Sequence, residues 1–212
     1  MDHPDDDTPS EVPYGCRHCA TRAAFVGGTA RMPRDCPTLT HGDVAKDVAG
    51  YAGEDAAATM SVANDAPIDP EGRLRTRVEE LVFFAKARGW RRIGVAFCVT
   101  LTREAQQLGR ILSAAGLEPE LVCCRVGAVD YDAIGLPKAH PERYAAICNP
   151  IAQARLLDAR GADLIVNLGL CLGHDLLLQQ TAKAPVTTLI VKDRVHDHNP
   201  ILALREAPVL PG

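Results

Sequence analysis

Residues 73–205 alternate between short apolar runs and segments of helical character, and this alternation restricts the fold more than any other feature of the sequence. Four apolar runs have the length of buried strands: 92–98, 120–124, 163–168 and 186–191. Four segments between and before them are expected to be helical: 74–88, 102–115, 151–160 and 173–182. Strand and helix alternating at this spacing predict a parallel sheet with helices on both of its faces.

The predicted fold class is α/β: a single Rossmann-like three-layer domain with a mostly parallel sheet, plus an irregular Cys-containing N-terminal segment. We assign residues 43–212 to the α/β domain, with a further helix near 43–52 and a loop at 64–72. Residues 14–42 are rich in Pro, Gly and polar side chains and form the Cys-containing segment. Residues 1–13 hold four Asp residues and no apolar run, which predicts a disordered tail and argues against a secretory signal.

Composition narrows the classes of function. Aromatic residues are 4% of the chain, the net charge is −4 and the pI is about 6.0, so a basic, aromatic nucleic-acid-binding face is not expected. No stretch approaches the ~18 apolar residues of a membrane span, and we expect a cytoplasmic protein without membrane or nucleic-acid partners. The eight cysteines are too sparse for a small disulfide-bonded scaffold. In a reducing compartment such cysteines are core residues, nucleophiles or metal ligands.

The cysteines of the α/β domain recur at one level of the predicted fold. Cys98 ends the first strand, Cys123 and Cys124 end the second, and Cys171 follows the third in a Gly-rich turn. Cys148 directly precedes the helix expected at 151–160. Because sites in open parallel sheets form at the carboxyl ends of the strands, we predict a metal site there. Its ligands are Cys98, Cys124, Cys148 and Cys171. Cys123 faces the opposite way along its strand and is expected to be a core residue.

A metal centre is the simplest way to hold several thiolates together, because they would otherwise repel one another. Cysteine ligands suit zinc or an iron–sulfur cluster. Structural zinc usually takes paired C-x-x-C ligands, whereas these four cysteines come singly from four separate loops, so we favour a [4Fe-4S] cluster over zinc. A metal-free thiol enzyme is a further alternative, with Cys171 as the nucleophile near His174.

Other residues at the same edge are assigned to cofactor binding or to catalysis. Arg125 and Lys192 are expected to offset the negative charge of the thiolates, and backbone amides at the Gly-rich turn to approach the sulfurs. The cofactor-binding residues are Arg125, Gly169 and Gly173. The catalytic candidates are His174, Asp175, Lys192 and Asp193. The alternative for His174 and Asp175 is a structural role at the start of their helix.

Two loops adjoin this edge. Residues 125–147 form a loop long enough to act as a lid. His196 and His198 stand two residues apart in an extended segment, where they either bind a metal from one side or are exposed loop residues.

The N-terminal cysteines give a separate signal. Cys16 and Cys19 form a C-x-x-C pair, and Cys36 follows later in the segment, a pattern similar to a small zinc knuckle. A second metal there would take His18, His41 or a water as its fourth ligand. The alternative is a metal-free segment whose cysteines have no common role.

Five segments can be compared with known families: IGVAFCVTLTREA (93–105), CRVGAVD (124–130), CNPIAQA (148–154), GLCLGHD (169–175) and APVTTLIVKDRVHDHNP (184–200). Together they resemble a widespread prokaryotic family, the domain-of-unknown-function family eighteen-forty-seven, described as predicted metal-binding proteins. The resemblance covers about residues 14–205 and implies metal binding by the edge cysteines and the N-terminal cysteines. Family members usually show a four-cysteine N-terminal pattern, whereas this chain reads ATRAA at 20–24, where another Cys is expected.

These observations predict a metal-binding protein that carries a [4Fe-4S] cluster or zinc, with a second metal at the N-terminal cysteines. One hypothesis is an enzyme that uses the cluster as a Lewis acid or sulfur acceptor on a small-molecule substrate. A second is an electron-transfer or metal- or redox-sensing protein with a redox partner protein. A third is a zinc-binding structural or interaction module without redox chemistry.

Overall fold

The computed structural model of the chain describes residues 14–19 and 23–206. It divides into two compact units, residues 1–58 and 59–212, and the division falls within helix α3 (Glu54–Asp65). The predicted tail, residues 1–13, lies outside the described residues.

The second unit contains a parallel sheet of four strands in the order β2-β1-β3-β4. The strands are β1 (Arg92–Phe97), β2 (Glu118–Cys123), β3 (Leu164–Leu168) and β4 (Val186–Ile190). Phe97 pairs with both Cys123 and Leu168, so β1, β2 and β3 end at the same level. The segments that follow these strands therefore start at one edge of the sheet. The predicted α/β fold with a parallel sheet is confirmed.

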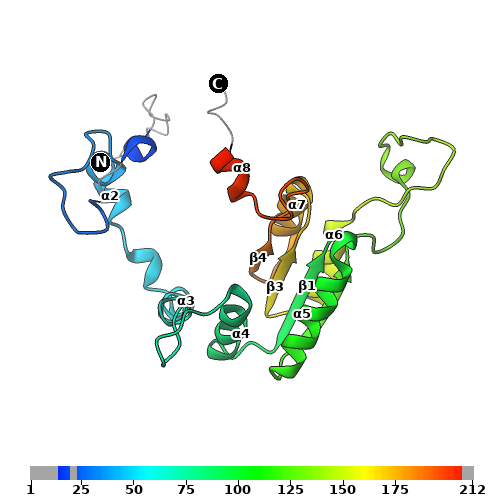
Figure 1. Cartoon of the computed structure of the whole chain (residues 1–212), viewed down its shortest axis with the longest axis horizontal. Helices are drawn as coiled ribbons and strands as arrows, with labels where there is room; N and C mark the ends of the chain where they lie inside the picture. The colour runs from blue at the N-terminus through cyan, green and yellow to red at the C-terminus, as the bar shows by residue number, and fades with distance from the viewer. Residues whose placement is uncertain (1–13, 20–22, 207–212) are drawn as a thin grey trace, which may run out of the picture. The chain divides into compact units, whose positions relative to one another are not determined.

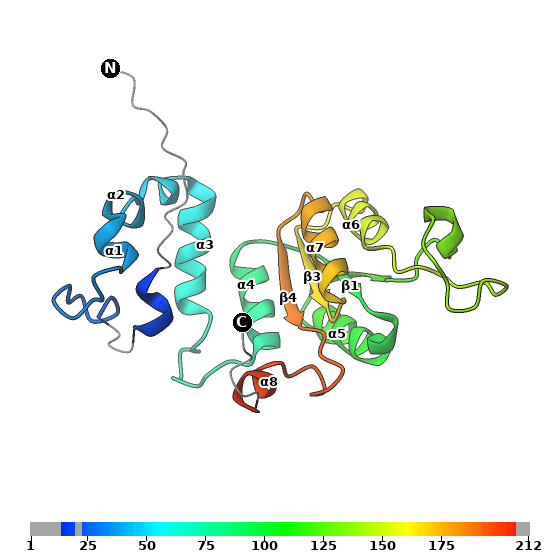
Figure 2. The same ribbon diagram turned by 90° about the horizontal axis from the view of Figure 1, so that it is seen from above.

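Helices cover both faces of the sheet (Figures 1 and 2). Helices α4 (Arg77–Ala87) and α5 (Thr102–Ala114) pack on one face, and α6 (Pro150–Ala159) and α7 (Leu172–Thr181) pack on the other. Because side chains alternate along a strand, Val95 and Phe97 join the cluster under α4 and α5, whereas Ala96 joins the cluster under α6 and α7. Cys98 follows in the same alternation and also lies on the α6 and α7 side.

Close approach of α6 to the sheet depends on a glycine in β1. A Cβ atom built on Gly94 would lie 3.1 Å from both Cδ atoms of Leu157, which is fully buried on α6. Since real Cβ atoms rarely have neighbours this close, a larger residue would push the helix away. The small residue thus sets the distance between α6 and the strands that lead to the cysteines.

Capping residues fix where the helices begin. Thr76 forms a capping box with Glu79, so α4 starts later than its apolar periodicity predicts, and Leu74 stays outside the helix and exposed. The side chain of Asn149 accepts a hydrogen bond from the backbone N–H of Ala152 and caps α6, as its position before Pro150 predicts. The helix predicted over 102–115 begins with Thr102 as its first residue, directly after the short helix η3 (Val99–Leu101).

The first unit is built from short elements. These are η1 (Gly15–His18), α1 (Pro37–Thr40), α2 (Gly42–Ala45), η2 (Ala49–Tyr51) and the start of α3. The helix predicted near 43–52 is interrupted, because the Asp47 side chain accepts a hydrogen bond from the backbone N–H of Ala49 and favours a turn. Helix α3 was not predicted, although its alanines and its acidic first turn favour a helix.

A further short helix, α8 (Ile201–Glu206), ends the described chain and was not predicted. Within the described ranges, none of the helices combines the length and the apolar character needed to cross a membrane.

Residues 125–147, here called the arm, project from the sheet domain (Figure 1). The arm holds the short helix η4 (Tyr131–Ile134) and is organised around Asp130. The Asp130 carboxylate accepts hydrogen bonds from the backbone N–H groups of Asp132 and Ala145 and from Lys138, each at 3.0 Å. These contacts, the Asp132 N–H first among them, lower the pKa of Asp130 to about 2. The predicted loop is therefore an ordered arm.

Candidate metal centre

Three cysteine thiols gather beyond the carboxyl ends of β1 and β2. The Sγ atoms of Cys124 and Cys148 lie 3.7 Å apart. Cys98 and Cys124 are 7% and 1% exposed and belong to the hydrophobic cluster under α6 and α7, against which Cys148 packs. The structure thus brings together the thiols of two of the four predicted ligands and places a third, Cys98, in the same hydrophobic cluster, although these residues come from three separate segments.

Backbone hydrogen bonds between the segments hold these thiols in place. The N–H of Cys98 donates to the carbonyl of Leu168 at 3.1 Å, which ties the end of β1 to the end of β3. The N–H of Cys124 donates to the carbonyl of Phe97 at 2.8 Å, and the carbonyl of Cys124 accepts from the N–H of Asn149 at 2.7 Å. The position of each cysteine is therefore fixed by a neighbouring strand or helix start.

Gln153, on the first turns of α6, is a site residue that the sequence analysis did not single out. Its side chain is fully buried, and its Nε2 donates to the carbonyls of Val122 at 2.7 Å and Phe97 at 3.3 Å. These carbonyls immediately precede Cys123 and Cys98. Because both partners are acceptors, the amide nitrogen must face them, and Oε1 is left buried without a hydrogen-bond partner. Through these two hydrogen bonds, Gln153 holds the ends of β1 and β2 together.

The thiols differ in how easily they ionise. Burial raises the pKa of Cys98, but hydrogen bonds from Thr100 and the positive charge of Lys192 outweigh it, so that the pKa lies below its usual value. Burial raises the pKa of Cys124 to about 12, although its Sγ accepts a hydrogen bond from the backbone N–H of Val99 at 3.3 Å. Without a bound cation, Cys98 is the readier thiolate and Cys124 stays protonated at neutral pH.

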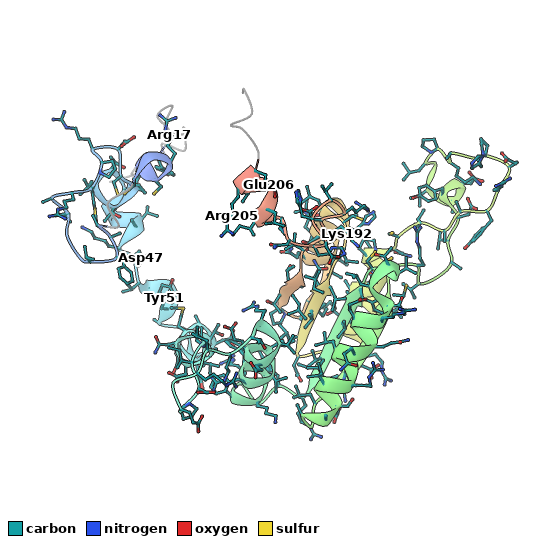
Figure 3. All side chains as sticks on the ribbon, in the orientation of Figure 1. Arg17, Asp47, Tyr51, Lys192, Arg205 and Glu206 are labelled. Atoms are coloured by element: carbon teal, nitrogen blue, oxygen red, sulfur yellow. The ribbon has the colours of Figure 1, made fainter. Side chains whose placement is uncertain are left out.

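Two basic side chains lie near these thiols, Lys192 near Cys98 and Arg125 near Cys124 and Cys148. The Nζ atom of Lys192 donates to Oγ1 of Thr100 at 2.9 Å, and that oxygen lies 3.2 Å from Sγ of Cys98. Figure 3 labels Lys192 in the segment that follows β4. Burial lowers the pKa of Arg125. The charges of Cys148 and Cys124 raise it by more, so the pKa of Arg125 lies above its usual value. Its guanidinium also donates to the carbonyl of Ala146 in the arm. Both residues thus lie beside the predicted ligands.

Cys171, the fourth predicted ligand, contacts an arginine. It is half-buried at the start of α7, and its Sγ lies 3.0 Å from Nη2 of Arg194. His174, in the first turn of α7, has a lowered pKa because it is partly buried and faces the positive charges of Arg125 and Arg194. These effects favour the neutral form of His174. The sequence places Arg194 at this edge but assigns it no role, and its contact with Cys171 appears only in the structure.

The loop after β4 is organised by Asp193. Its carboxylate accepts hydrogen bonds from the backbone N–H groups of Val195 and His196 and contacts the His196 ring at 3.1 Å. These bonds keep the pKa of Asp193 low, the His196 N–H contributing most. The carboxylate thus faces its own loop, whereas Lys192 and Arg194 on either side of it reach towards the thiols. Asp193 supports the position of these two cations.

The remaining candidates of this edge have local partners. The Asp175 carboxylate accepts a hydrogen bond from Gln179 at 2.6 Å along α7. His198 accepts a hydrogen bond from the backbone N–H of Asp193. Gly169 has a φ of +70°, and a Cβ there would collide with Leu101, so this turn requires glycine. Gly173 has open space around it and an ordinary φ.

A protein family model described as "Protein of unknown function (DUF1847)" matches residues 36–189. The chain belongs to this family. A curated relative, the uncharacterized protein MJ0455 of Methanocaldococcus jannaschii, is 46% identical over 125 residues, which are 59% of this chain and 64% of that protein. The chain thus covers less than two thirds of the length of this relative. No solved structure matches the chain.

The DUF1847 match includes the edge cysteines, Arg125 and Gln153, and it ends before the segment of Lys192 and Arg194. It is narrower than the resemblance drawn from the sequence motifs, which extends to residue 205. Among the side chains that the structure describes, no group of three or more His, Cys, Asp or Glu residues is spaced to hold a metal ion. Cys98, Cys124 and Cys148 are therefore not spaced as three ligands of one ion, and a metal held by all three would require Cys98 to move towards the other two.

The N-terminal cysteines lie in the other unit, and the DUF1847 match begins at Cys36. Cys16 and Cys19 are exposed, and Cys36 is buried at the start of α1. The N–H of Gly15 donates to the carbonyl of Asp35 at 2.9 Å, so the residues that follow, Cys16 and Cys36, stand on neighbouring stretches of chain. His41 contacts Thr40 through Nδ1, and its ring packs edge-on against Tyr14.

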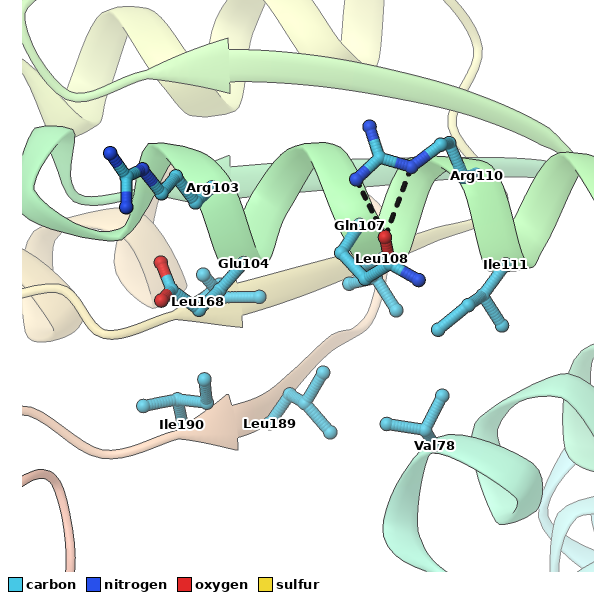
Figure 4. A pocket seen from close by; sticks show the side chains of 10 residues that line it. All are labelled: Val78, Arg103, Glu104, Gln107, Leu108, Arg110, Ile111, Leu168, Leu189 and Ile190. Carbon is cyan, nitrogen blue, oxygen red and sulfur yellow. Dashed lines mark hydrogen bonds between the residues drawn. The ribbon is translucent and has the colours of Figure 1, made fainter.

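An apolar groove of about 500 Å³ lies on the opposite face of the sheet (Figure 4). Leu108 and Ile111 of α5 face Leu189 and Ile190 of β4 across it, and Val78 of α4 closes one end. At the rim of the groove, the guanidinium of Arg110 donates hydrogen bonds to the side-chain oxygen of Gln107. The groove lies on the α5 side of the sheet, whereas Cys98 and Cys124 lie on the α6 and α7 side.

Proposed function

We propose that this chain is a metal-binding protein whose centre is held by thiolates at the carboxyl edge of the sheet, with Cys98, Cys124 and Cys148 as ligands. The observation that carries the proposal is the 3.7 Å separation of the Cys124 and Cys148 sulfurs. Two ligands on one tetrahedral ion with metal–sulfur bonds of about 2.3 Å are about 3.8 Å apart. The pair therefore has the spacing of two ligands to a single ion.

The surroundings of the thiols support this proposal. Lys192 and Arg125 offset the charge of the thiolates, and the N–H of Val99 donates to the Cys124 sulfur, as donors around metal-bound sulfur commonly do. Because Cys124 has a pKa of about 12, a metal must displace its proton. Metal affinity is expected to rise with pH for this reason.

The first candidate for the metal is a single zinc ion, because the Cys124 and Cys148 sulfurs have the spacing of two ligands to one ion. A [4Fe-4S] cluster is the second candidate, favoured by the origin of the four predicted ligands on separate segments, with Cys171 as the fourth. Each iron of such a cluster takes one cysteine, so Cys124 and Cys148 would have to move apart. When bound, either group would supply Lewis-acid chemistry, and the cluster would add electron transfer.

We propose that the N-terminal cysteines hold a second metal. The juxtaposition of Cys16 and Cys36 through the Gly15–Asp35 hydrogen bond supports this, together with the C-x-x-C pair that Cys16 forms with Cys19. Two of its ligands, Cys16 and Cys19, lie on the short helix η1 and at its end.

The test is anaerobic purification of the full chain followed by metal and acid-labile sulfide analysis. Cys148→Ser is expected to lose one equivalent of metal, whereas Cys123→Ser, which alters a neighbouring thiol that is not a proposed ligand, is expected to keep it. Cys19→Ser is expected to lose the second equivalent alone. Zinc without sulfide would support the single ion, and iron with sulfide the cluster. Equal metal contents in Cys148→Ser and the unaltered chain would refute the centre at the edge.

A further inference from the structure

A cavity in the arm has the size and charge of a small-molecule site. Its volume is about 580 Å³, within the range of ligand sites in proteins. Tyr131 and Tyr144 line it together with the basic side chains Arg125, Lys138 and Arg143. Aromatic rings beside cationic groups favour a flat molecule that carries negative charge.

The basic side chains that line the cavity differ in how free they are to bind a ligand. Lys138 has a side chain only 6% exposed and is already paired with Asp130 and Asp132. Arg143 is exposed at the cavity, and its contact with Glu142 at 3.5 Å is a surface ion pair that contributes little. Arg143 is therefore free to exchange this partner for a ligand.

Arg125 connects the cavity with the thiols. It lines the cavity, donates to the carbonyl of Ala146 and interacts with Cys148. Since a guanidinium has five N–H donors, these contacts leave donors for an anion in the cavity. A ligand held by Arg125 and Arg143 would lie beside the proposed metal centre.

We propose that the arm cavity binds a small organic anion, a carboxylate or phosphate on a planar ring, between the two tyrosines and the guanidinium groups of Arg125 and Arg143. The anion is the substrate or effector of the neighbouring metal centre, and this part of the inference rests on the proposed function. The anion site itself uses only the side chains of the arm.

Calorimetric titration of the full chain with benzoate and with phenyl phosphate tests the proposal, with benzamide as the neutral analogue. Benzoate or phenyl phosphate is expected to bind with an affinity that falls at high salt, and benzamide to bind at least tenfold more weakly. Arg143→Gln is expected to weaken anion binding by about tenfold or more, because a hydrogen bond to a charged group is worth that much. Arg143→Lys should recover part of the loss.

Arg110→Gln, on the rim of the groove over α5, is the matched control and is expected to bind like the unaltered chain. Equal binding of benzamide and benzoate would overturn the proposal, as would full affinity in Arg143→Gln. Metal content is measured on the same samples. Anion binding by a chain that takes up no metal would refute the metal centre alone, and metal uptake without anion binding would refute the anion site alone.

Discussion

Replacing Gln153 by leucine tests how the carboxyl edge is held together. The leucine keeps nearly the same volume but removes the Nε2 donor to the carbonyls of Val122 and Phe97. The Phe97 carbonyl keeps the N–H of Cys124 as a donor, and the parallel register of β1 and β2 gives the Val122 carbonyl the N–H of Phe97. Each carbonyl therefore loses a second donor, and the loss of one hydrogen bond costs about 0.5–1.5 kcal/mol, or about 1–3 kcal/mol for the two. Removal of the unpartnered Oε1 offsets roughly 1 kcal/mol of this.

The expected net change is a loss of about 1 kcal/mol, within a range of about 0–2 kcal/mol, in the free energy of unfolding, measured from urea transitions monitored by circular dichroism. Gln179→Leu is the matched control, because Gln179 is exposed on α7, and its effect should stay within about 0.5 kcal/mol. Labelling of Cys98 and Cys124 by a maleimide should also become faster in Gln153→Leu, since the two strand ends lose their common partner. A higher stability of Gln153→Leu, or an unchanged stability together with unchanged labelling of both thiols, would refute the reasoning.

Three further predictions concern the frame of the site. Gly94→Ala should lower the free energy of unfolding by about 1–3 kcal/mol because its Cβ meets Leu157, and adding Leu157→Val should recover part of this loss. Gly169→Ala should cost at least about 2 kcal/mol through its positive φ and the collision with Leu101, whereas Gly173→Ala should be neutral or stabilising, as urea transitions can show. Because two backbone N–H groups and a lysine lower the pKa of Asp130 to about 2, the arm should lose protection against hydrogen exchange as the pH falls from about 4 to about 2. A carboxyl titration by NMR that gave Asp130 an ordinary pKa of about 3.9 would contradict that prediction.

The sign of the pH effect follows from the folded and unfolded states of Asp130. Its pKa is lower in the folded arm than in an unfolded chain, so the carboxylate stabilises the arm above the unfolded pKa of about 3.9. That stabilisation is lost as the pH falls through the folded value of about 2. Asp130→Asn should remove the pH dependence in this range.

Much of the fold was predictable because its signals are local. Each strand of the sheet coincides with an apolar run, and Asn149 with Pro150 marks the start of α6 as capping chemistry requires. The errors also have local causes. Leu74 fits the periodicity of α4, but the capping box at Thr76 starts the helix after it. The turn at Asp47 interrupts a helix that periodicity alone favours.

The candidate site was predictable only in part. The order of strands and helices placed Cys98, Cys124 and Cys148 at one edge, because parallel strands end at the same side of a sheet. The roles of Gln153 and Arg194 were not predictable, since a glutamine within a helix and an arginine in a loop give no local signal of the residues that they contact. Their importance depends on contacts with segments more than twenty residues away in sequence.

The sequence by itself determined the alternation of strands and helices and the side of the sheet on which the cysteines emerge, because backbone periodicity and capping act over a few residues. Only the tertiary structure decided that the Cys124 and Cys148 sulfurs stand 3.7 Å apart and that Cys171 meets Arg194. These distances depend on strand register and on how closely α6 and α7 pack against the sheet. Packing of this kind is a property of many residues together, and no local pattern specifies it.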